Sequence, residues 1–173
     1  EKYVNNGLSG VYGREYNTDE LYIEVVKDLA FYDGDWSSLE LEKMPGGVTF
    51  SGGECLLQMD RLEPLLERLK AEKIHTAVET CLFAPAYQLS IAIKYIDLFY
   101  VDIKILDKEK SREYLRGDLS VYHINLQKLL ISGKTILFRI PVIGGYTDTD
   151  DNRRKVVELL KHLEGNILKI ELI

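Results

Sequence analysis

The chain has 173 residues, 46% of them hydrophobic, and a formal net charge of −6. This length and apolar content predict one domain with a substantial core, and the acidic balance argues against binding to nucleic acid or to an anionic membrane. No apolar run approaches the roughly 18 residues that a membrane helix requires, and the polar residues 1–13 do not resemble a signal peptide.

The chain contains two cysteines, Cys55 and Cys81, which stand 26 positions apart. So few cysteines fit a reduced, cytoplasmic setting. Neither cysteine lies in a CxxC or CxxxCxxC spacing, so this chain alone cannot ligate a metal or an iron–sulfur cluster through thiolates. His75 and His123 have no partner at metal-ligand spacing. The sequence therefore predicts no metal-ligating residues.

The first predicted helix begins at Thr18, the expected N-cap, with Asp19 and Glu20 in its first turn, where the helix dipole favours acids. Apolar residues recur at helical spacing to about Phe31, and an irregular loop follows over residues 33–45. Residues 1–17 are weakly patterned, with turn signals at Asn5-Asn6-Gly7, Gly10 and Gly13. We interpret them as the remnant of a preceding segment.

From residue 48 onward, predicted strands and helices alternate. Apolar β-type runs begin near Val48, His75, Leu98, Thr135 and Ile167. Helical stripes fall between them, at Leu62/Leu65/Leu66/Leu69, Tyr87/Ile91/Tyr95, Tyr122/Leu126/Leu129/Leu130 and Val156/Val157/Leu159/Leu160/Leu163. A strand and a helix recurring about every 30 residues predict successive βαβ units and a parallel sheet.

A glycine-rich stretch, Gly46–Glu54, ends the first of these strands. Its Ser51-Gly52-Gly53 segment lets backbone groups approach a ligand closely, because no Cβ stands in the way. A glutamate follows at once, and parallel-sheet proteins collect polar groups at this end of their strands. The stretch lacks the lysine of a P-loop.

The other predicted strands also carry charged residues at or near their ends. These residues are Glu79 with Thr80, Asp102 with Lys104, Arg139 and Glu171. Two interpretations remain open. The charges pair with one another, as Asp102–Arg139 or Glu79–Lys104, or they converge on a ligand. Five charged residues, Glu54, Glu79, Asp102, Lys104 and Arg139, would converge beside the double glycine, which favours a ligand site.

These segments resemble the radical SAM activating enzymes of glycyl radical enzymes, of which pyruvate formate-lyase activating enzyme is the best-known type. The resemblance rests on five segments in the order of the family. They are Gly47–Glu54 with Leu56-Leu57-Gln58, Ile74–Thr80, Asp97–Lys104, Arg139–Ile143 with Gly145–Asp148, and Lys169–Leu172. Together they extend over about residues 13–173.

The resemblance implies an α/β fold, a partial (β/α)6 TIM-like barrel with about five of its six strands present. It implies binding of S-adenosylmethionine over a 4Fe-4S cluster, reductive cleavage of that cofactor, and installation of a glycyl radical on a partner enzyme such as pyruvate formate-lyase. A flavodoxin or a ferredoxin-type protein would donate the electron. The implied cofactor-binding residues are Ser51, Gly52, Gly53, Glu54, Glu79, Thr80, Asp102, Ile103, Lys104 and Arg139.

The chain departs from this family in several places. The CxxxCxxC loop and the strand before it are absent from the sequence, so residues 1–173 are expected to be a single truncated radical SAM domain that is inactive alone. Cys55 replaces the usual proline, and Cys81-Leu82 replaces a common Ser-Gly or Asn-Gly. An open barrel of this kind exposes the Val48–Phe50 strand as an edge, which predicts association of the isolated chain.

Two other functions remain open. The scaffold would serve a radical SAM enzyme that acts on another substrate, or a degenerate, non-catalytic barrel that binds the cofactor or a partner protein. In the first case a neighbouring gene would not encode a glycyl radical enzyme. In the second, the chain would bind S-adenosylmethionine tightly without a cluster.

Overall fold

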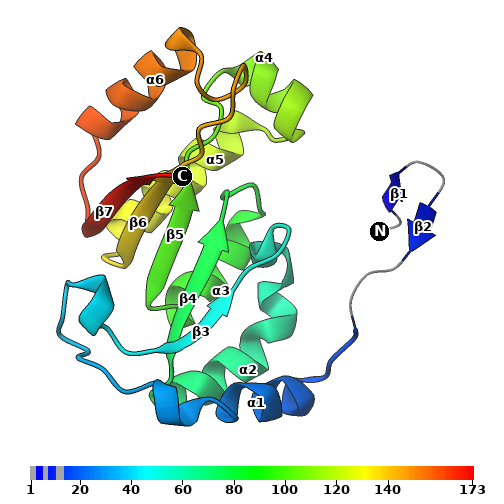
Figure 1. Ribbon diagram of the computed structural model, residues 1–173, viewed down its shortest axis with the longest axis vertical. Coiled ribbons are helices and arrows are strands. Elements are labelled where there is room, and N and C mark those ends of the chain that lie inside the picture. The colour runs from blue at the N-terminus through cyan, green and yellow to red at the C-terminus, as the bar shows by residue number, and fades with distance from the viewer. Residues whose placement is uncertain (1–2, 6–7, 11–13) are drawn as a thin grey trace.

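Five parallel strands form the single sheet on which the site is built (Figure 1). The computed structural model describes residues 3–5, 8–10 and 14–173. The strands lie in sequence order, as β3 (Gly47–Phe50), β4 (His75–Thr80), β5 (Leu98–Asp102), β6 (Thr135–Ile140) and β7 (Ile167–Leu172). This confirms the predicted α/β fold and the predicted starts of the five strands. Parallel strands in sequence order are the arrangement that a partial (β/α) barrel requires.

The helices that connect these strands are α2 (Met59–Ala71), α3 (Ala86–Tyr95), α5 (Leu119–Ile131) and α6 (Asp150–Lys161). Figure 1 shows α2, α3 and α5 behind the sheet, so they cover one of its faces. The helix α5 ends in a turn that requires Gly133, whose φ is 74°. Glycine adopts such a left-handed conformation without a steric penalty.

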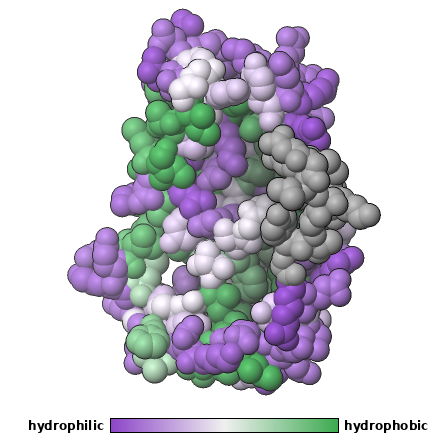
Figure 2. Space-filling model, turned by 45° about the vertical axis from the view of Figure 1, so that its right-hand side comes forward, coloured by the Kyte–Doolittle hydropathy of each residue, from purple (hydrophilic) through white to green (hydrophobic). Residues whose placement is uncertain are grey.

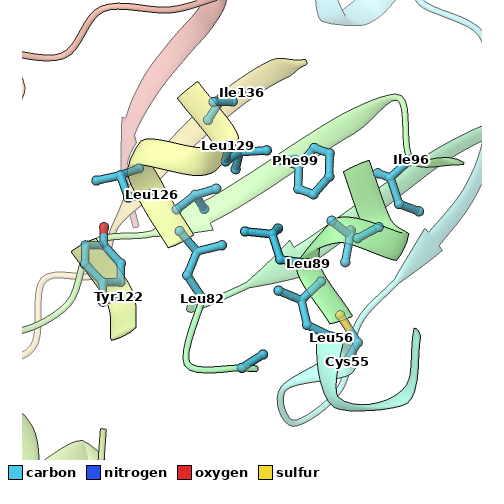
Figure 3. Close-up of a cluster of buried hydrophobic side chains, with 14 of the residues drawn as sticks. Cys55, Leu56, Leu82, Leu89, Ile96, Phe99, Tyr122, Leu126, Leu129 and Ile136 are labelled. Carbon is cyan, nitrogen blue, oxygen red and sulfur yellow. The ribbon is translucent and has the colours of Figure 1, made fainter. Parts of the chain in front are cut away.

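The core lies between this helix layer and the sheet (Figure 3). Phe99 of β5, Leu89 of α3 and Leu129 of α5 are completely buried, and Leu126 and Ile136 are nearly or completely so. Burying a side chain of this size stabilises the fold by about 1.5–3 kcal/mol. The residues of the apolar helical stripes and of the continuous apolar strands therefore form the contact between the two layers.

The helix α1 (Thr18–Val26) packs beneath α2 and differs from its predicted limits. Asn17, not Thr18, is the N-cap, and it exchanges hydrogen bonds with Glu20 in a capping box. The α-helix ends at Val26, and a 3₁₀ turn at Leu29–Phe31 replaces the predicted last turn. Helix ends commonly tighten in this way, which periodicity alone does not reveal.

Several further elements were not predicted. The strands β1 (Tyr3–Asn5) and β2 (Leu8–Gly10) pair antiparallel near the N-terminus. The predicted turn at Asn6-Gly7 and the one at Gly13 lie outside the described residues. A short helix, α4 (Lys108–Lys110), runs into a π-helical turn at Ser111–Leu115.

The sheet's second face carries the polar strand ends. Because successive side chains of a strand alternate between faces, Tyr100 and Asp102 of β5 share this face. The register pairs Glu79 with Tyr100, Asp102 with Arg139, and Arg139 with Glu171. The face away from the helices is therefore charged where the strands end.

On the face shown in Figure 2, hydrophobic surface occurs in patches between hydrophilic residues. Several exposed large apolar side chains, among them Phe31, Trp36 and Leu39, lie in or beside the loop before β3, and the most exposed one, Ile131, lies at the end of α5. In the part of the chain that the structure describes, no helix has both the length and the apolar character to cross a bilayer.

Candidate functional site

Arg139 joins two acidic residues from two different strands. Its Nη1 lies 2.8 Å from Oε1 of Glu79 on β4, and its Nε lies 3.1 Å from Oδ1 of Asp102 on β5. The guanidinium also lies 5.4 Å from the centre of the Tyr100 ring. The predicted Asp102–Arg139 pair is therefore confirmed.

Lys104 takes a different partner from the one considered in the sequence. Its Nζ lies 3.4 Å from Oδ2 of Asp102, so the Glu79–Lys104 pair is wrong, because Arg139 reaches Glu79 from β6. The side chains of Arg139 and Asp102 are 17% and 16% exposed, and that of Lys104 is 35% exposed. Lys104 is thus the cation of this group with most access to solvent or to a ligand.

Ser51 extends this charged network to the glycine-rich loop. Its hydroxyl donates to Oε2 of Glu79 over 2.6 Å. This hydrogen bond, followed by the one from Arg139, lowers the pKa of Glu79 below its usual range, because both stabilise the carboxylate. Ser51, Glu79, Arg139, Asp102 and Lys104 form one continuous network, which we call the rim network.

The two pairs of glycines in Gly46–Gly53 have different roles. A Cβ on Gly46 or Gly47 would collide with backbone atoms, in the case of Gly47 with the carbonyl of His75 on β4. A Cβ on Gly52 or Gly53 would meet no described atom within 4 Å, and Gly52 has a φ of 124°. Gly47 therefore allows close packing of β3 against β4, Gly46 allows close approach to the backbone of Phe31, and Gly52 and Gly53 present open backbone beside Ser51.

Glu54 makes its hydrogen bonds outside the rim network. Its carboxylate accepts hydrogen bonds from Thr80 Oγ1 at 2.8 Å, from the backbone N–H of Leu56 at 3.1 Å, and from both the N–H and the Sγ–H of Cys81 at 2.8 and 2.9 Å. These bonds tie the loop after β3 to the end of β4. Glu54 and Thr80, both predicted as cofactor-binding, thus bind each other.

The two cysteines are hydrogen-bond donors within the fold. Cys55 Sγ lies 3.0 Å from the backbone carbonyl of Glu79. Burial, reinforced by the charge of Glu54, raises the pKa of each thiol to about 12. Both are therefore neutral thiols near pH 7, and Cys55 is buried in the core. Over residues 3–5, 8–10 and 14–173, no three His, Cys, Asp or Glu side chains could hold a metal ion.

Ile103 has its side chain in the core and is completely buried. Its backbone N–H donates to the carbonyl of Arg139 over 2.8 Å. Ile103 was predicted to bind a cofactor, but with its side chain buried and its N–H bonded it can offer a ligand only its backbone carbonyl.

Two asparagines that the sequence analysis missed hold the loops of the site. The amide nitrogen of Asn152 donates to the carbonyls of Lys104 and Thr147, over 2.8 and 2.9 Å. The amide nitrogen of Asn125 donates to the carbonyls of Leu82 and Ala84, over 2.9 and 2.8 Å. Their signal in the sequence is a polar residue in the first half of an amphipathic helix, where it is easily taken for a solvated position.

The arrangement suits a small ligand that carries charges of both signs. The open backbone at Gly52 and Gly53 offers donors and acceptors, Asp102 offers acceptor oxygens, and Lys104 offers an ammonium group. Arg139 is bonded to two carboxylates, so it orients both of them and helps to lower the pKa of Glu79. The rim network can therefore bind and orient such a ligand.

No protein-family model matches the chain. The chain is 34% identical over 173 residues to trans-4-hydroxy-L-proline dehydratase activating enzyme of Clostridioides difficile, covering 98% of this chain and 53% of that protein. It is 33% identical over 161 residues to pyruvate formate-lyase 2-activating enzyme of Escherichia coli K12, covering 93% and 51%. It thus spans about half the length of the curated relatives it matches.

Among solved structures, the chain resembles a domain of pyruvate-formate lyase-activating enzyme from Bacteroides vulgatus ATCC 8482. The TM-score is 0.65 at 28% identity, covering 73% of this chain and 79% of the other. Both comparisons lead to activating enzymes, and the structural match extends the likeness from sequence to fold.

Proposed function

Because this chain belongs to the activating enzymes of glycyl radical enzymes, we propose that it forms the S-adenosylmethionine-binding part of a radical SAM activating enzyme. The observation that carries this proposal is the rim network beside the open Gly52-Gly53 backbone. The whole enzyme would install a glycyl radical on a partner such as pyruvate formate-lyase, in the cytoplasm, with a flavodoxin or ferredoxin-type protein as electron donor.

The residues present fit the polar groups of S-adenosylmethionine. Its methionyl end carries an ammonium and a carboxylate, and its ribose carries two hydroxyls. The backbone of Gly52 and Gly53 and the ammonium of Lys104 suit the methionyl end, and the carboxylate of Asp102 suits hydroxyl donors. Arg139 and Ser51 hold Glu79 and Asp102 in place. When bound, the cofactor supplies the radical chemistry, and these side chains bind and orient it.

The residues described here do not fit a 4Fe-4S cluster. Such a cluster requires thiolates, whereas Cys55 and Cys81 are protonated and bonded within the fold. We therefore propose that this chain contributes the cofactor-binding sheet of the enzyme, and we assign no cluster ligand to residues 14–173.

Binding of S-adenosylhomocysteine, which retains the methionyl and ribose groups, tests this proposal by calorimetry. In Gly53→Val the new side chain enters open space, so we expect little loss of thermal stability but at least about a tenfold loss of affinity, equivalent to about 1.4 kcal/mol. Lys104→Met should also weaken binding by about tenfold, because it removes the ammonium and keeps the aliphatic stem.

Lys161→Met on α6 is the matched control. Its side chain is 63% exposed and its ammonium lies 3.7 Å from a carboxylate oxygen of Glu158, so we expect unchanged affinity. If the unaltered chain failed to bind S-adenosylhomocysteine, or if Lys104→Met and Lys161→Met bound it equally well, the proposal would be wrong.

A further inference from the structure

Tyr122 of α5 has a buried hydroxyl that the fold does not satisfy. The residue is 2% exposed and lies at the edge of the core cluster (Figure 3). Its ring packs 5.9 Å from that of Phe83. Its hydroxyl has no hydrogen-bond partner among the residues that the structure describes. A buried polar group without a partner destabilises a fold, so such groups nearly always bond to protein or to ordered water.

The surroundings of Tyr122 lead directly to the rim network. Tyr122 lines a cavity of about 10 Å³ together with Asp102, Lys104, Cys81 and Phe83, and with neighbouring apolar residues. This volume is at the lower limit of the space that one water molecule needs. Several of the lining residues carry polar atoms, as a buried water requires. The cavity therefore has both the size and the polarity for a single water.

The negative charge of Asp102 affects the pKa of the Tyr122 hydroxyl. Burial is the first cause that raises the pKa of Tyr122, and the carboxylate of Asp102 is the second. The hydroxyl is therefore protonated near pH 7 and is available as a donor. Arg139 and Lys104 hold Asp102 from the open face of the sheet, whereas Tyr122 approaches from the helix layer.

We propose that Tyr122 is a positioning residue of the cofactor site, whose hydroxyl donates to one water in this cavity, which in turn donates to the carboxylate of Asp102. Asp102 is then held from both sides of the sheet, and its orientation toward a bound ribose is defined. The role in ligand binding rests on the proposed function, whereas the water link is a property of the ligand-free protein.

Crystal structures of the ligand-free chain test the water link in the unaltered protein and in Tyr122→Phe. We expect an ordered water about 3 Å from both Tyr122 Oη and an oxygen of Asp102 in the unaltered protein. In Tyr122→Phe we expect the water to be lost and Asp102 to adopt more than one conformation. A dry cavity in the unaltered protein, or the same water and the same Asp102 conformation in both proteins, would overturn the inference.

Binding of S-adenosylhomocysteine tests the consequence for the ligand. We expect Tyr122→Phe to weaken binding by about tenfold with the fold intact. The matched control is Tyr95→Phe on α3, because Tyr95 is 5% exposed and its hydroxyl bonds Glu63 over 3.0 Å, away from the rim network. We expect the control to bind like the unaltered chain.

The two proposals fail in different ways. Unchanged affinity in Tyr122→Phe, or an equal loss in Tyr95→Phe, would show that Tyr122 does not position the site. Failure of the unaltered chain to bind would instead refute the proposed function, and the crystals would still decide whether the water link exists.

Discussion

Replacing Arg139 by leucine tests whether the rim network stabilises the fold as well as binding a ligand. Arg139→Leu keeps an aliphatic side chain on β6 and removes the cation that joins Glu79 to Asp102. Two carboxylates then lie on neighbouring strands without their shared partner. Removing one member of a buried ion pair is costly, because the remaining charge stays desolvated.

The structure sets the size of this effect. A hydrogen bond to a charged group contributes about 1.5–3 kcal/mol, and Arg139 makes one to each carboxylate. The side chains of Arg139, Asp102 and Glu79 are 17%, 16% and 32% exposed, so solvent reduces the loss below that of a fully buried pair. We expect the free energy of unfolding, measured in urea at pH 7, to fall by about 2–4 kcal/mol.

The pH dependence identifies the cause. The pKa of Glu79 is lowered in the folded chain, so at acidic pH the unfolded chain binds more protons, and stability rises with pH. The contribution of Glu79 is complete above its unfolded pKa of about 4.3 and is lost as pH falls through the lower, folded value. The difference between the unaltered chain and Arg139→Leu should therefore be largest near pH 7 and shrink below about pH 4.

Arg153→Leu on α6 is the matched control, because Arg153 pairs with Asp150 on the surface, where the two side chains are 63% and 87% exposed. Exposed pairs contribute little, so we expect a change of no more than about 0.5–1 kcal/mol. Equal losses in the two variants, or a loss in Arg139→Leu that is the same at pH 3 and pH 7, would refute this reasoning.

Three further variants or treatments probe the loops of the site. Leu82 is completely buried and has a φ of 59°, so Leu82→Ala should lower the free energy of unfolding by about 2–5 kcal/mol. Glycine adopts this backbone conformation freely, so Leu82→Gly should be about 1 kcal/mol more stable than Leu82→Ala. The opposite order in urea unfolding would contradict this expectation. Gly47→Ala should destabilise the chain by about 1–3 kcal/mol or more, because the new Cβ meets the backbone of β4. Gly53→Ala should change the stability by no more than about 0.5 kcal/mol. Equal melting temperatures of the two variants would argue against the assigned roles. Because their pKa values are raised to about 12, Cys55 and Cys81 should react with iodoacetamide at pH 8 roughly a thousandfold more slowly in the folded chain than in urea. Fast labelling of the folded chain would show that the thiols are not held as described.

The periodic part of the sequence was enough to predict the sheet. Leu98–Val101 and Ile136–Phe138 are continuous apolar runs because helices cover one face of each strand, while Leu98 and Leu137 on the other face are also buried. The helical stripes mark the side that meets the sheet. The limits of α1 were predicted less accurately, since helix ends depend on hydrogen bonds that apolar spacing does not encode, and the short α4 was not predicted.

The candidate site was predictable as a set of residues and not as a set of contacts. Strand ends in a parallel sheet meet at one edge, so Glu79, Asp102, Lys104 and Arg139 could be grouped from the sequence. Which charge pairs with which depends on the strand register, and Glu79 and Arg139 are 60 positions apart. The direction in which Glu54 points likewise depends on donors from the end of β4.

The sequence by itself determined the order of strands and helices, the glycine-rich loop after β3 and the charges that gather at the sheet edge, because these features follow from local spacing and from the two faces of a strand. Only the tertiary structure decided that Arg139 joins Glu79 to Asp102, that Glu54 ties two loops together, that Ile103 belongs to the core, and that Tyr122 faces a cavity beside Asp102. Each of these depends on atoms brought together from distant parts of the chain, where hydrogen-bond geometry and burial select one partner among several that the sequence allows.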